Sequence, residues 1–560
     1  MRGDCPALLA HPNALSNAHI GSAVRRCTGT SGRRRFRNLT AHLQSRYLGA
    51  ASSETTGALL LSRRFGSDCL LCRREEFVEI NRVSARDVNK AHYELVVIGS
   101  GFGSCFFLAE ALKHISGRAL IIEWGDFHAW DWQIKHQQSS AIAQESTYDN
   151  RGEKPWNMTI ALGGGMNCWF SQTPRLHPTD FALRSRYGVA HDWPLSYEDL
   201  EPYYCQAEQI MSIAGDPDMA RALPRSQPFP QPPHKGSSID MIMKAAMPDH
   251  HFIMPTGRAR VATGTRGVCC ANATCNLCPV NAKFTAQNGF AELFSHSQVD
   301  VCLNAEVRTL EYEGSHVKAA TIRTEAGEFR VNGDLFVLGA NAIQSPAILM
   351  RSDIVHGDTG MGLHEQVGAN VEVYLDGLGN FDGSTITTGL NYALYDGDFR
   401  RDHSGCLVYF ENRWPYGLRP ERGRWNQTLP LMVVCEDLPS RDNRVVVDPK
   451  SGDAIVDYRG ESEYGKKGVQ YGLDNLERLL APLPVESINF REWRLTESHV
   501  QGTLRMGASD DGSVVDAQML HHRMRNLVVV GTSTYPSCSP ANPSLTAAAL
   551  SIRAADLLFS

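Results

Sequence analysis

A glycine-rich turn between two apolar runs constrains the fold of this chain more than any other feature. Residues 92–98, His-Tyr-Glu-Leu-Val-Val-Ile, have the aliphatic and β-branched composition of a buried strand. Residues 99–104 read Gly-Ser-Gly-Phe-Gly-Ser, and an apolar helical stretch follows as far as Ile115. A second apolar run, residues 118–122, ends in Glu123. Strand, glycine turn, helix, strand and acid, in this order, predict a Rossmann-like dinucleotide-binding unit.

The positions of this turn have separate roles in such a unit. Gly99 permits the tight turn, and Gly101 lets the backbone approach a pyrophosphate that the helix N-terminus stabilises. Ser104 stands where a third glycine is usual, and it is small enough for close packing of helix on strand. Glu123 is placed to bind a ribose hydroxyl, which suits NAD as well as FAD. We expect the dinucleotide to contact Gly99, Gly101, Phe102, Gly103, Ser104 and Glu123.

A second glycine run lies in residues 161–169, Ala-Leu-Gly-Gly-Gly-Met-Asn-Cys-Trp. Three consecutive glycines leave a row of backbone N–H groups free to face an anion or a flat ring. A flexible loop is the simpler alternative for the same residues. Cys168 is close enough in sequence to approach a bound ring, although a buried structural thiol is the more economical interpretation.

The C-terminal residues repeat the pattern of strand, glycine and helix. An apolar strand over residues 526–530 leads to Gly531, a turn rich in proline and serine, and an alanine-rich helix beginning near Pro543. Proline fits a first helical position because its missing N–H has no partner there anyway. A helix N-terminus after a glycine turn can receive an electron-rich group of a cofactor. His499 and Asn542 lie on either side of this strand in the sequence.

These residues resemble a known family. Residues 526–543, with His499-Val-Gln-Gly-Thr-Leu-Arg-Met-Gly507, are similar to the closing segment of the glucose–methanol–choline (GMC) oxidoreductases, which are FAD-dependent alcohol oxidases and dehydrogenases. In that family a His–His or His–Asn pair faces the flavin, and His499 with Asn542 matches the His–Asn branch. The resemblance implies an FAD site that also includes Gly163, Gly164, Gly165, Asn167, Val307, Gly531, Thr532, Asn542 and Pro543.

The pair has a chemical purpose in such an enzyme. Alcohol oxidation by a flavin needs a base for the hydroxyl proton and an acceptor, flavin N5, for the hydride. Histidine suits the first role because its ordinary pKa, near ~6.5, lies close to working pH. We expect His499 to take the proton and Asn542 to orient the substrate oxygen. The neighbouring His521 and His522 are interpreted as surface residues.

The predicted activity is therefore oxidation of a CH–OH group in a sugar, polyol or other alcohol, with FAD as cofactor and a non-NAD acceptor, for which an electron-acceptor protein is one candidate. An oxygen-using oxidase and a non-redox FAD-containing lyase are the alternatives. A NAD-dependent dehydrogenase is disfavoured, because the glycines at 163–165 and the closing segment would then lack a purpose. A net charge of -6 argues against a general nucleic-acid binder. No run approaches the ~18 to 20 apolar residues needed to span a bilayer, so we expect a soluble enzyme.

Four cysteines gather within ten residues, as Cys269-Cys270-Ala-Asn-Ala-Thr-Cys275-Asn-Leu-Cys278. Thiolates favour zinc and iron–sulfur clusters. The run is similar to one in the flavoprotein subunits of certain bacterial sugar and gluconate dehydrogenases, which hold a three-iron cluster, but it is one residue shorter between its last two cysteines. An iron–sulfur cluster on Cys269, Cys270, Cys275 and Cys278, a structural disulfide or buried thiols, and zinc or a redox-active thiol pair all stay open.

At 560 residues the chain is too long for one core. Residues 1–74 contain twelve arginines, no lysine and three acids, a composition that fits an organelle transit peptide, a disordered tail or translated upstream sequence. We expect an α/β fold, α+β overall: a Rossmann-like FAD domain built from discontinuous segments, with an antiparallel-sheet substrate domain. The expected order is a disordered or targeting-like extension (1–88), the first FAD segment (90–235), the cysteine segment with FAD-domain return strands (236–350), the substrate domain (351–494) and the FAD-domain closure (495–560).

Overall fold

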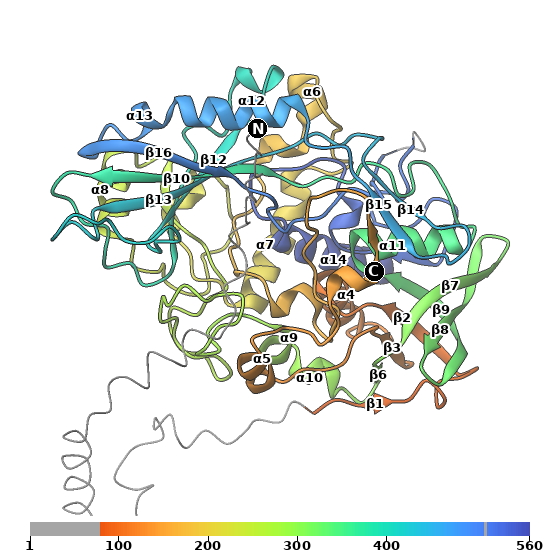
Figure 1. Ribbon diagram of the computed structural model, residues 1–560. Helices are drawn as coiled ribbons and strands as arrows, with labels where there is room; N and C mark the ends of the chain where they lie inside the picture. Colours follow the sequence, from red (N-terminus) through yellow and green to blue (C-terminus); the bar gives the residue numbers. More distant parts are fainter. Residues whose placement is uncertain (1–78, 509–511) are drawn as a thin grey trace, which may run out of the picture. The chain divides into compact units, whose positions relative to one another are not determined.

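The computed structural model describes residues 79–508 and 512–560, and its first sheet is built around the strand that precedes the glycine turn (Figure 1). Strand β2 (His92–Ile98) pairs in parallel with β3 (Ala119–Ile122) on one side and with β9 (Gly327–Leu338) on the other. Its last four residues are buried, as expected for a parallel strand covered on both faces. The sheet order is β1-β6-β3-β2-β9-β8-β7, with β17 beside β9; the remaining bounds are β1 (Arg82–Val83), β6 (Val299–Cys302), β7 (Glu306–Glu313), β8 (His316–Thr324) and β17 (Leu527–Val529).

Three long helices pack together beside this sheet. Helix α14 (Ser544–Phe559) contacts both α4 (Phe102–Ala111) and α7 (Tyr197–Met211), which lie together in Figure 1. Helix α7 begins with a capping box in which the side chains of Ser196 and Asp199 bind each other's backbone N–H. The other α-helices are α5 (Trp130–His136), α6 (Leu183–Tyr187), α8 (Ser238–Ala246), α9 (Ala286–Gly289), α10 (Ala291–Phe294), α11 (Asn341–Arg351), α12 (Glu463–Asp474) and α13 (Leu476–Leu479).

The second sheet is separate from the first, and its strands are antiparallel. Its order is β16-β10-β13-β12-β11-β5, and its two central strands, β12 (Cys406–Glu411) and β13 (Thr428–Cys435), are buried along their whole length. Helices α8, α12 and α13 contribute buried residues to the core that forms against this sheet. The other strands are β5 (His251–Ile253), β10 (Val367–Leu375), β11 (Thr387–Asn391) and β16 (Val485–Trp493). The predicted fold class, a Rossmann-like sheet with an antiparallel one, is confirmed.

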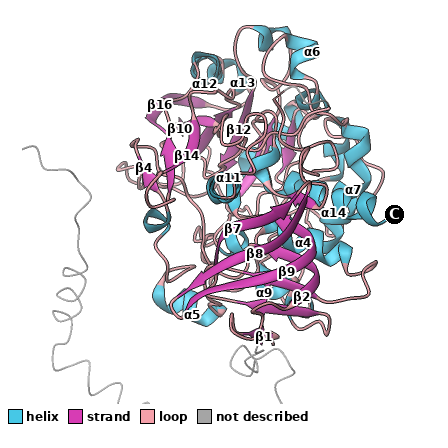
Figure 2. Cartoon of the chain, turned by 90° about the vertical axis from the view of Figure 1, so that its right-hand side faces the viewer, coloured by secondary structure: helices cyan, strands magenta, loops and turns pink. Residues whose placement is uncertain are grey.

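The segments that build these sheets are more interleaved than the sequence indicated. Strand β5 lies in the segment assigned to the cysteine run, yet it pairs with β11 of the antiparallel sheet. A third, small sheet joins β14 (Arg444–Val447) and β15 (Ala454–Asp457) to β4 (Asp149–Asn150), which comes from the first FAD segment. Figure 2 shows β7, β8 and β9 as long neighbouring strands, with the antiparallel sheet above them.

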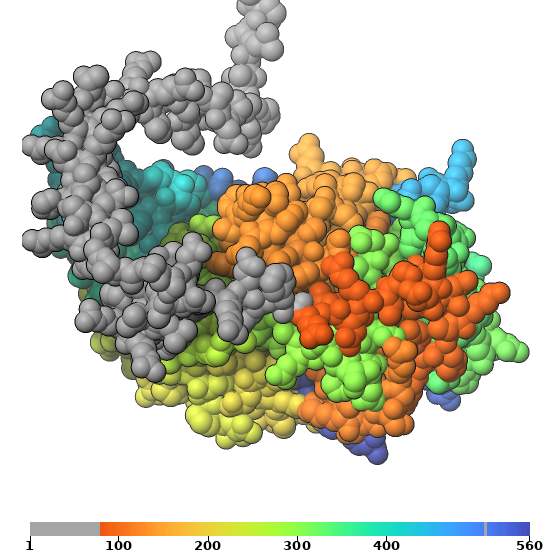
Figure 3. Space-filling model, turned by 90° about the horizontal axis from the view of Figure 1, so that it is seen from below, coloured from red at the N-terminus to blue at the C-terminus, as the bar shows by residue number. Residues whose placement is uncertain are grey.

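Residues 79–88 belong to the fold, although the sequence predicted that they would be part of an unstructured extension. The prediction of an unstructured extension as far as residue 88 is wrong for residues 79–88, because β1 pairs in parallel with β6 and the Asn81 N–H donates to the carbonyl of Phe294. Figure 3 shows this first described segment, in red, on the surface against green residues. The rest of the extension, with its targeting-like composition, lies outside the described residues. Within the described chain, no helix has the length and apolar character that crossing a membrane requires.

Candidate active site

A cavity of about 850 Å³ brings together residues from every predicted segment of the site. It opens where β2 and β17 end, and residues from the second sheet, such as Tyr409 and Met432, form its opposite side. The predicted site residues that line it are Gly99, Gly101, Phe102, Gly103, Glu123, Gly164, Gly165, Val307, His499, Gly531, Thr532, Asn542 and Pro543.

Three residues that were expected to bind the dinucleotide do not line this cavity and lie behind the residues that do. Ser104 is buried on α4, where it packs against the glycine at the end of β9. The N–H of Gly163 donates to Ser100 Oγ at 2.9 Å, and Asn167 Nδ2 donates to the Leu162 carbonyl at 2.8 Å. These residues shape the two turns that face the cavity, and they are not among those that line it.

In the first glycine turn, one glycine is required by the backbone conformation, and another leaves an open surface. Gly99 has φ of +86°, and a Cβ there would lie 2.5 Å from the Gly339 carbonyl oxygen, so a side chain is excluded by backbone alone. At Gly101, in contrast, an added Cβ would meet no described atom within 4 Å. Gly165 and Gly531 are open in the same way and also line the cavity. The glycines therefore leave a surface without side chains, against which a flat or elongated group can lie.

Glu123 connects the two glycine turns through hydrogen bonds. Its Oε2 accepts hydrogen bonds from the N–H (3.1 Å) and hydroxyl (2.6 Å) of Ser100, and its Oε1 accepts from the Gly125 N–H at 3.0 Å. Because Ser100 Oγ also accepts from Gly163, one serine joins both turns to the carboxylate. Burial raises the pKa of Glu123 to about 7, against the lowering effect of these donors. A carboxylate has room for a further donor, such as a ribose hydroxyl.

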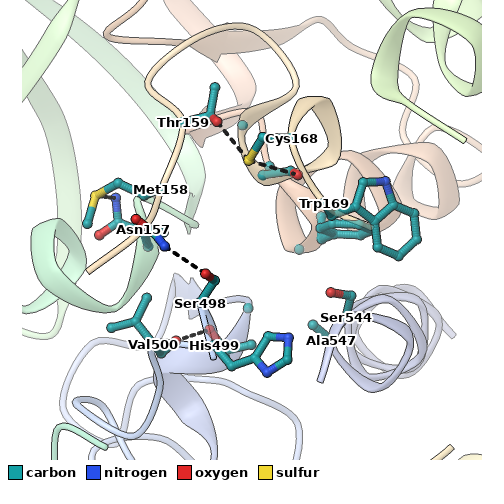
Figure 4. A pocket seen from close by; sticks show the side chains of 18 of the residues that line it. Asn157, Met158, Thr159, Cys168, Trp169, Ser498, His499, Val500, Ser544 and Ala547 are labelled. Carbon is teal, nitrogen blue, oxygen red and sulfur yellow. Dashed lines mark hydrogen bonds between the residues drawn. The ribbon is translucent and has the colours of Figure 1, made fainter. Parts of the chain in front are cut away.

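The imidazole of His499 and the carboxamide of Asn542 meet at the cavity wall. His499 follows β16 by six positions and Asn542 lies two positions before α14, yet His499 Nε2 is 3.3 Å from Asn542 Nδ2. In Figure 4 the His499 ring points into the cavity, between the segment of Ser498 and the helix that carries Ser544 and Ala547. Thr159 and Cys168 line the opposite side, where the Thr159 hydroxyl is 3.0 Å from the Cys168 sulfur.

Burial keeps His499 neutral at ordinary pH. Loss of solvent, followed by repulsion from the nearby Arg494 guanidinium, lowers its pKa to about 3. Its ring Nδ1 lies 3.0 Å from Gln366 Oε1, and its backbone N–H donates to Glu365 Oε2 at 2.9 Å. A neutral imidazole can accept a proton, which an imidazolium cannot.

The partners of Asn542 determine which way its amide points. Asn542 Nδ2 donates to Gln172 Oε1 at 3.2 Å, while the Tyr409 hydroxyl lies 3.0 Å from Asn542 Oδ1 and 3.1 Å from the Pro540 carbonyl. The Nδ2 group therefore faces His499 and the cavity as a donor. Gln172 is held in turn by Thr387 Oγ1 of β11, which accepts from its Nε2 at 2.6 Å. Sequence reasoning missed Gln172, Tyr409, Gln366 and Glu365, since no motif marks them.

Comparisons with known proteins agree with this geometry. Residues 484–551, which include His499 and Asn542, match the family model described as GMC oxidoreductase. The fructose dehydrogenase large subunit of Gluconobacter japonicus is 26% identical over 447 residues, covering 71% of this chain and 80% of its own. The 6'''-hydroxyparomomycin C oxidase of Streptomyces lividus is 28% identical over 502 residues, covering 82% and 90%. Over residues 484–551 this chain is similar to the GMC oxidoreductases.

Solved structures agree with the fold of this protein. The crystal structure of pyridoxine 4-oxidase from Mesorbium loti superimposes with a TM-score of 0.59 at 17% identity, covering 83% of this chain and 98% of that one. A structure of Aspergillus oryzae formate oxidase, determined to study FAD modification, gives a TM-score of 0.57 at 15% identity, with 84% and 98% covered. These solved structures share the fold described above.

The side of the cavity away from the glycine turns mixes charge and apolar surface. Arg494 Nε donates to Glu497 Oε1 at 2.6 Å, and Arg413 pairs with Glu411. Met432 and Val434, both from β13, line the same region with Phe170. The space beside His499 can therefore receive a molecule with both polar and apolar parts.

The four clustered cysteines do not converge on one centre. The Cys275 sulfur accepts from Arg258 Nη1 at 3.4 Å, Cys278 accepts from the Ala282 N–H at 3.3 Å, and Cys269 lies 3.7 Å from Thr385 Oγ1. Cys270 is exposed. In residues 79–508 and 512–560, three groups with metal-ligand spacing meet only at Glu110, His114 and Asp556, on another face. The iron–sulfur hypothesis thus gains no support, and iron and sulfide analysis of anaerobically purified protein is its test.

Proposed function

We propose that this protein binds FAD along its two glycine turns and oxidises the CH–OH group of a sugar, polyol or other small alcohol, with His499 as the base. The observation that carries the proposal is the 3.3 Å approach of His499 Nε2 to Asn542 Nδ2 at the wall of the cavity. Two polar groups, one neutral acceptor and one amide donor, converge on one point beside an otherwise smooth, glycine-lined surface.

The residues at the wall can divide the work on the alcohol between them. A hydroxyl group that enters beside both atoms can donate its proton to His499 Nε2 while its oxygen accepts from Asn542 Nδ2. Holding the oxygen at a set position reduces the entropy to be lost in the reaction. Bound FAD supplies the acceptor for the hydride that leaves the carbon. The proton then resides on the imidazole, whose Nδ1 lies 3.0 Å from Gln366 Oε1.

The chain offers suitable groups for each part of FAD. The open faces of Gly101 and Gly165 suit close approach of a pyrophosphate or ring, and the start of α4 directs backbone N–H groups at that region. Glu123 can accept from a ribose hydroxyl. We assign the remaining contacts to Phe102, Gly103, Gly164, Val307, Gly531, Thr532, Asn542 and Pro543.

The relatives support the reaction class and leave the electron acceptor open. They include a fructose dehydrogenase large subunit, a 6'''-hydroxyparomomycin C oxidase, a paromamine 6'-oxidase, a 2-methyl-1,2-propanediol dehydrogenase and a pyridoxine 4-oxidase. Dehydrogenases and oxidases are thus both represented. We propose a non-NAD acceptor, which is an electron-acceptor protein, a small quinone-like carrier or oxygen. Peroxide released in air during turnover identifies the last of these.

Anaerobic mixing of the purified holoprotein with a panel of sugars, polyols and simple alcohols tests the proposal. We expect yellow protein whose flavin absorbance is bleached by at least one member of the panel, with the carbonyl product formed in equal amount. A flavin that no alcohol bleaches, combined with cleavage of a hydroxynitrile, would instead establish a lyase. Protein that purifies without flavin and takes up none on reconstitution would refute the FAD site itself.

A further inference from the structure

We propose that Gln366 is a positioning residue: its single carboxamide sets the tautomer of His499 and joins His499 to the turn that carries Asn542. The inference rests on the proposed function, since it matters only if His499 is the base. Gln366 lies one residue before β10 and is 1% exposed, so water does not compete for its hydrogen bonds.

The orientation of this carboxamide follows from its partners. Gln366 Nε2 lies 2.8 Å from the Ser539 carbonyl and 3.0 Å from the Ala541 carbonyl. A carbonyl oxygen only accepts, so both contacts require the NH₂ end of the amide on that side. The opposite end, Oε1, then faces His499 Nδ1 at 3.0 Å. An amide oxygen only accepts as well, so Nδ1 must carry the hydrogen.

The tautomer of His499 decides its chemistry. With the hydrogen on Nδ1, a neutral ring has its lone pair on Nε2, the nitrogen that faces Asn542 Nδ2 and the cavity. The other tautomer would set an Nε2–H donor against the amide donor of Asn542 and leave no acceptor for a substrate proton. One buried amide therefore makes the ring a base at the useful nitrogen.

The second arm of Gln366 holds the other member of the pair. The Ser539 and Ala541 carbonyls belong to the turn that ends in Asn542. This turn is anchored in the interior, because Ser539 Oγ donates to Asp180 Oδ2 at 2.9 Å and Asp180 pairs with the fully buried Arg400 at 3.0 Å. Gln366 thus connects the anchored turn directly to the imidazole.

Glu365, the residue before Gln366, holds the backbone of His499 in place. Glu365 accepts from the N–H groups of Glu497 (3.2 Å) and His499 (2.9 Å), on either side of Ser498, whose φ is +63°. Lys154 Nζ, 2.8 Å from Glu365 Oε1, balances this buried charge. The charged or titratable groups around His499 are therefore Glu365, Glu497, Lys154, Arg494 and, through Asn542, Tyr409. A substitution at Gln366 leaves the chemical identity of all these groups unchanged.

The first test compares Gln366→Leu and Gln366→Glu as holoproteins by stopped-flow flavin reduction. Gln366→Leu removes both arms, and we expect a ~10²-fold slower limiting reduction, with FAD content and substrate affinity near wild type. Gln366→Glu keeps an acceptor at Nδ1 but favours the imidazolium, because a carboxylate replaces an amide. As the pH falls, we therefore expect the Gln366→Glu enzyme to lose its rate of flavin reduction at a pH about one unit or more above that of the wild-type enzyme.

A matched control separates positioning from general damage. Gln231 is another buried glutamine, whose Oε1 accepts from the N–H groups of Arg260 and Val261, and it does not line the cavity. We expect Gln231→Glu to leave the pH profile of flavin reduction at its wild-type position, even if the protein melts at a lower temperature. If Gln366→Leu does not fold, Gln366→Glu and the spectroscopic measurement below still decide the matter.

Long-range ¹H–¹⁵N spectra of histidine-labelled holoprotein read the tautomer directly, with His499→Ala used to assign the signal. We expect a protonated Nδ1 and an unprotonated Nε2 at neutral pH. The opposite tautomer, or Gln366 variants with wild-type rates and pH profile, would overturn this inference. His499→Ala distinguishes that failure from failure of the proposed function. If the His499→Ala enzyme still reduces its flavin at the normal rate, His499 is not the base and the proposed function itself fails.

Discussion

The two walls of the cavity differ in the groups that line them. The wall assigned to FAD consists of glycine backbone, at Gly99, Gly101, Gly165 and Gly531, where the absence of a side chain is the essential property. The reacting wall consists of side chains, His499 and Asn542, whose orientation depends on further side chains behind them. We infer that substitutions on the first wall act through steric exclusion, whereas substitutions on the second act through proton affinity and hydrogen-bond direction.

The largest effect is expected at Gly99, compared directly with Gly101. Gly99→Ala forces a Cβ to 2.5 Å from a backbone oxygen at a φ of +86°, which the surrounding strands cannot relieve. Strain of this kind costs ~1–3 kcal/mol before the steric clash is added. We expect little folded protein, measured as the yield and melting temperature of purified material.

Gly101→Val should separate folding from cofactor binding. Its Cβ meets no described atom within 4 Å, so the fold should persist while FAD is excluded. We expect a monodisperse, colourless protein with a circular dichroism spectrum like that of wild-type apoprotein. A yellow Gly101→Val variant with full FAD content would show that the cofactor does not lie against this turn.

On the reacting wall, His499→Ala should have the largest effect on chemistry. Removing a general base typically slows the step by ~10²–10⁴-fold, and FAD content should be unchanged because the glycine wall is intact. Anaerobic stopped-flow reduction with the best alcohol measures this. Reduction at close to the wild-type rate would contradict the assignment of the base.

Asn542→Ala should have a smaller effect on the same measurement. The variant leaves the proton acceptor in place and loses one donor to the substrate oxygen, a bond worth about 0.5–1.5 kcal/mol, or roughly 2–13-fold in rate. Asn542→Asp is the informative partner, since a carboxylate cannot donate from that position. We expect the aspartate variant to be slower than the alanine variant, and the reverse order would argue against a donor role.

The smallest expected effect concerns Glu123 and pH. Burial raises its pKa to about 7, above its ordinary value near 4.5, so the apoprotein binds this proton more tightly than the unfolded chain does. Its contribution to stability is therefore present below about pH 4.5 and is lost as the pH rises through about 7. A ribose hydroxyl donor favours the ionised form, so FAD should bind the apoprotein several-fold more tightly above pH 7 than below it. Reconstitution titrations measure this, and Glu123→Gln should flatten the dependence.

The sequence alone determined the parts of this protein that depend on local backbone requirements. A strand, a glycine turn and a helix are coded by adjacent residues, so β2, the turn at Gly99 and α4 could be placed to within a few residues. The strand before Gly531 was predictable for the same reason. His499 and Asn542 came from the family resemblance, which identified both residues without showing what holds them.

Only the tertiary structure decided how distant segments meet. Gln366, Gln172 and Tyr409 come from separate regions with no motif, and they acquire a role because folding places them within hydrogen-bond distance of the pair. The same reason explains the errors: β5 joins the antiparallel sheet through a pairing across more than a hundred residues, and His521, expected at the surface, is 1% exposed because the strand beside it is covered. Such contacts depend on which elements pack together, and short-range sequence patterns carry no information about that.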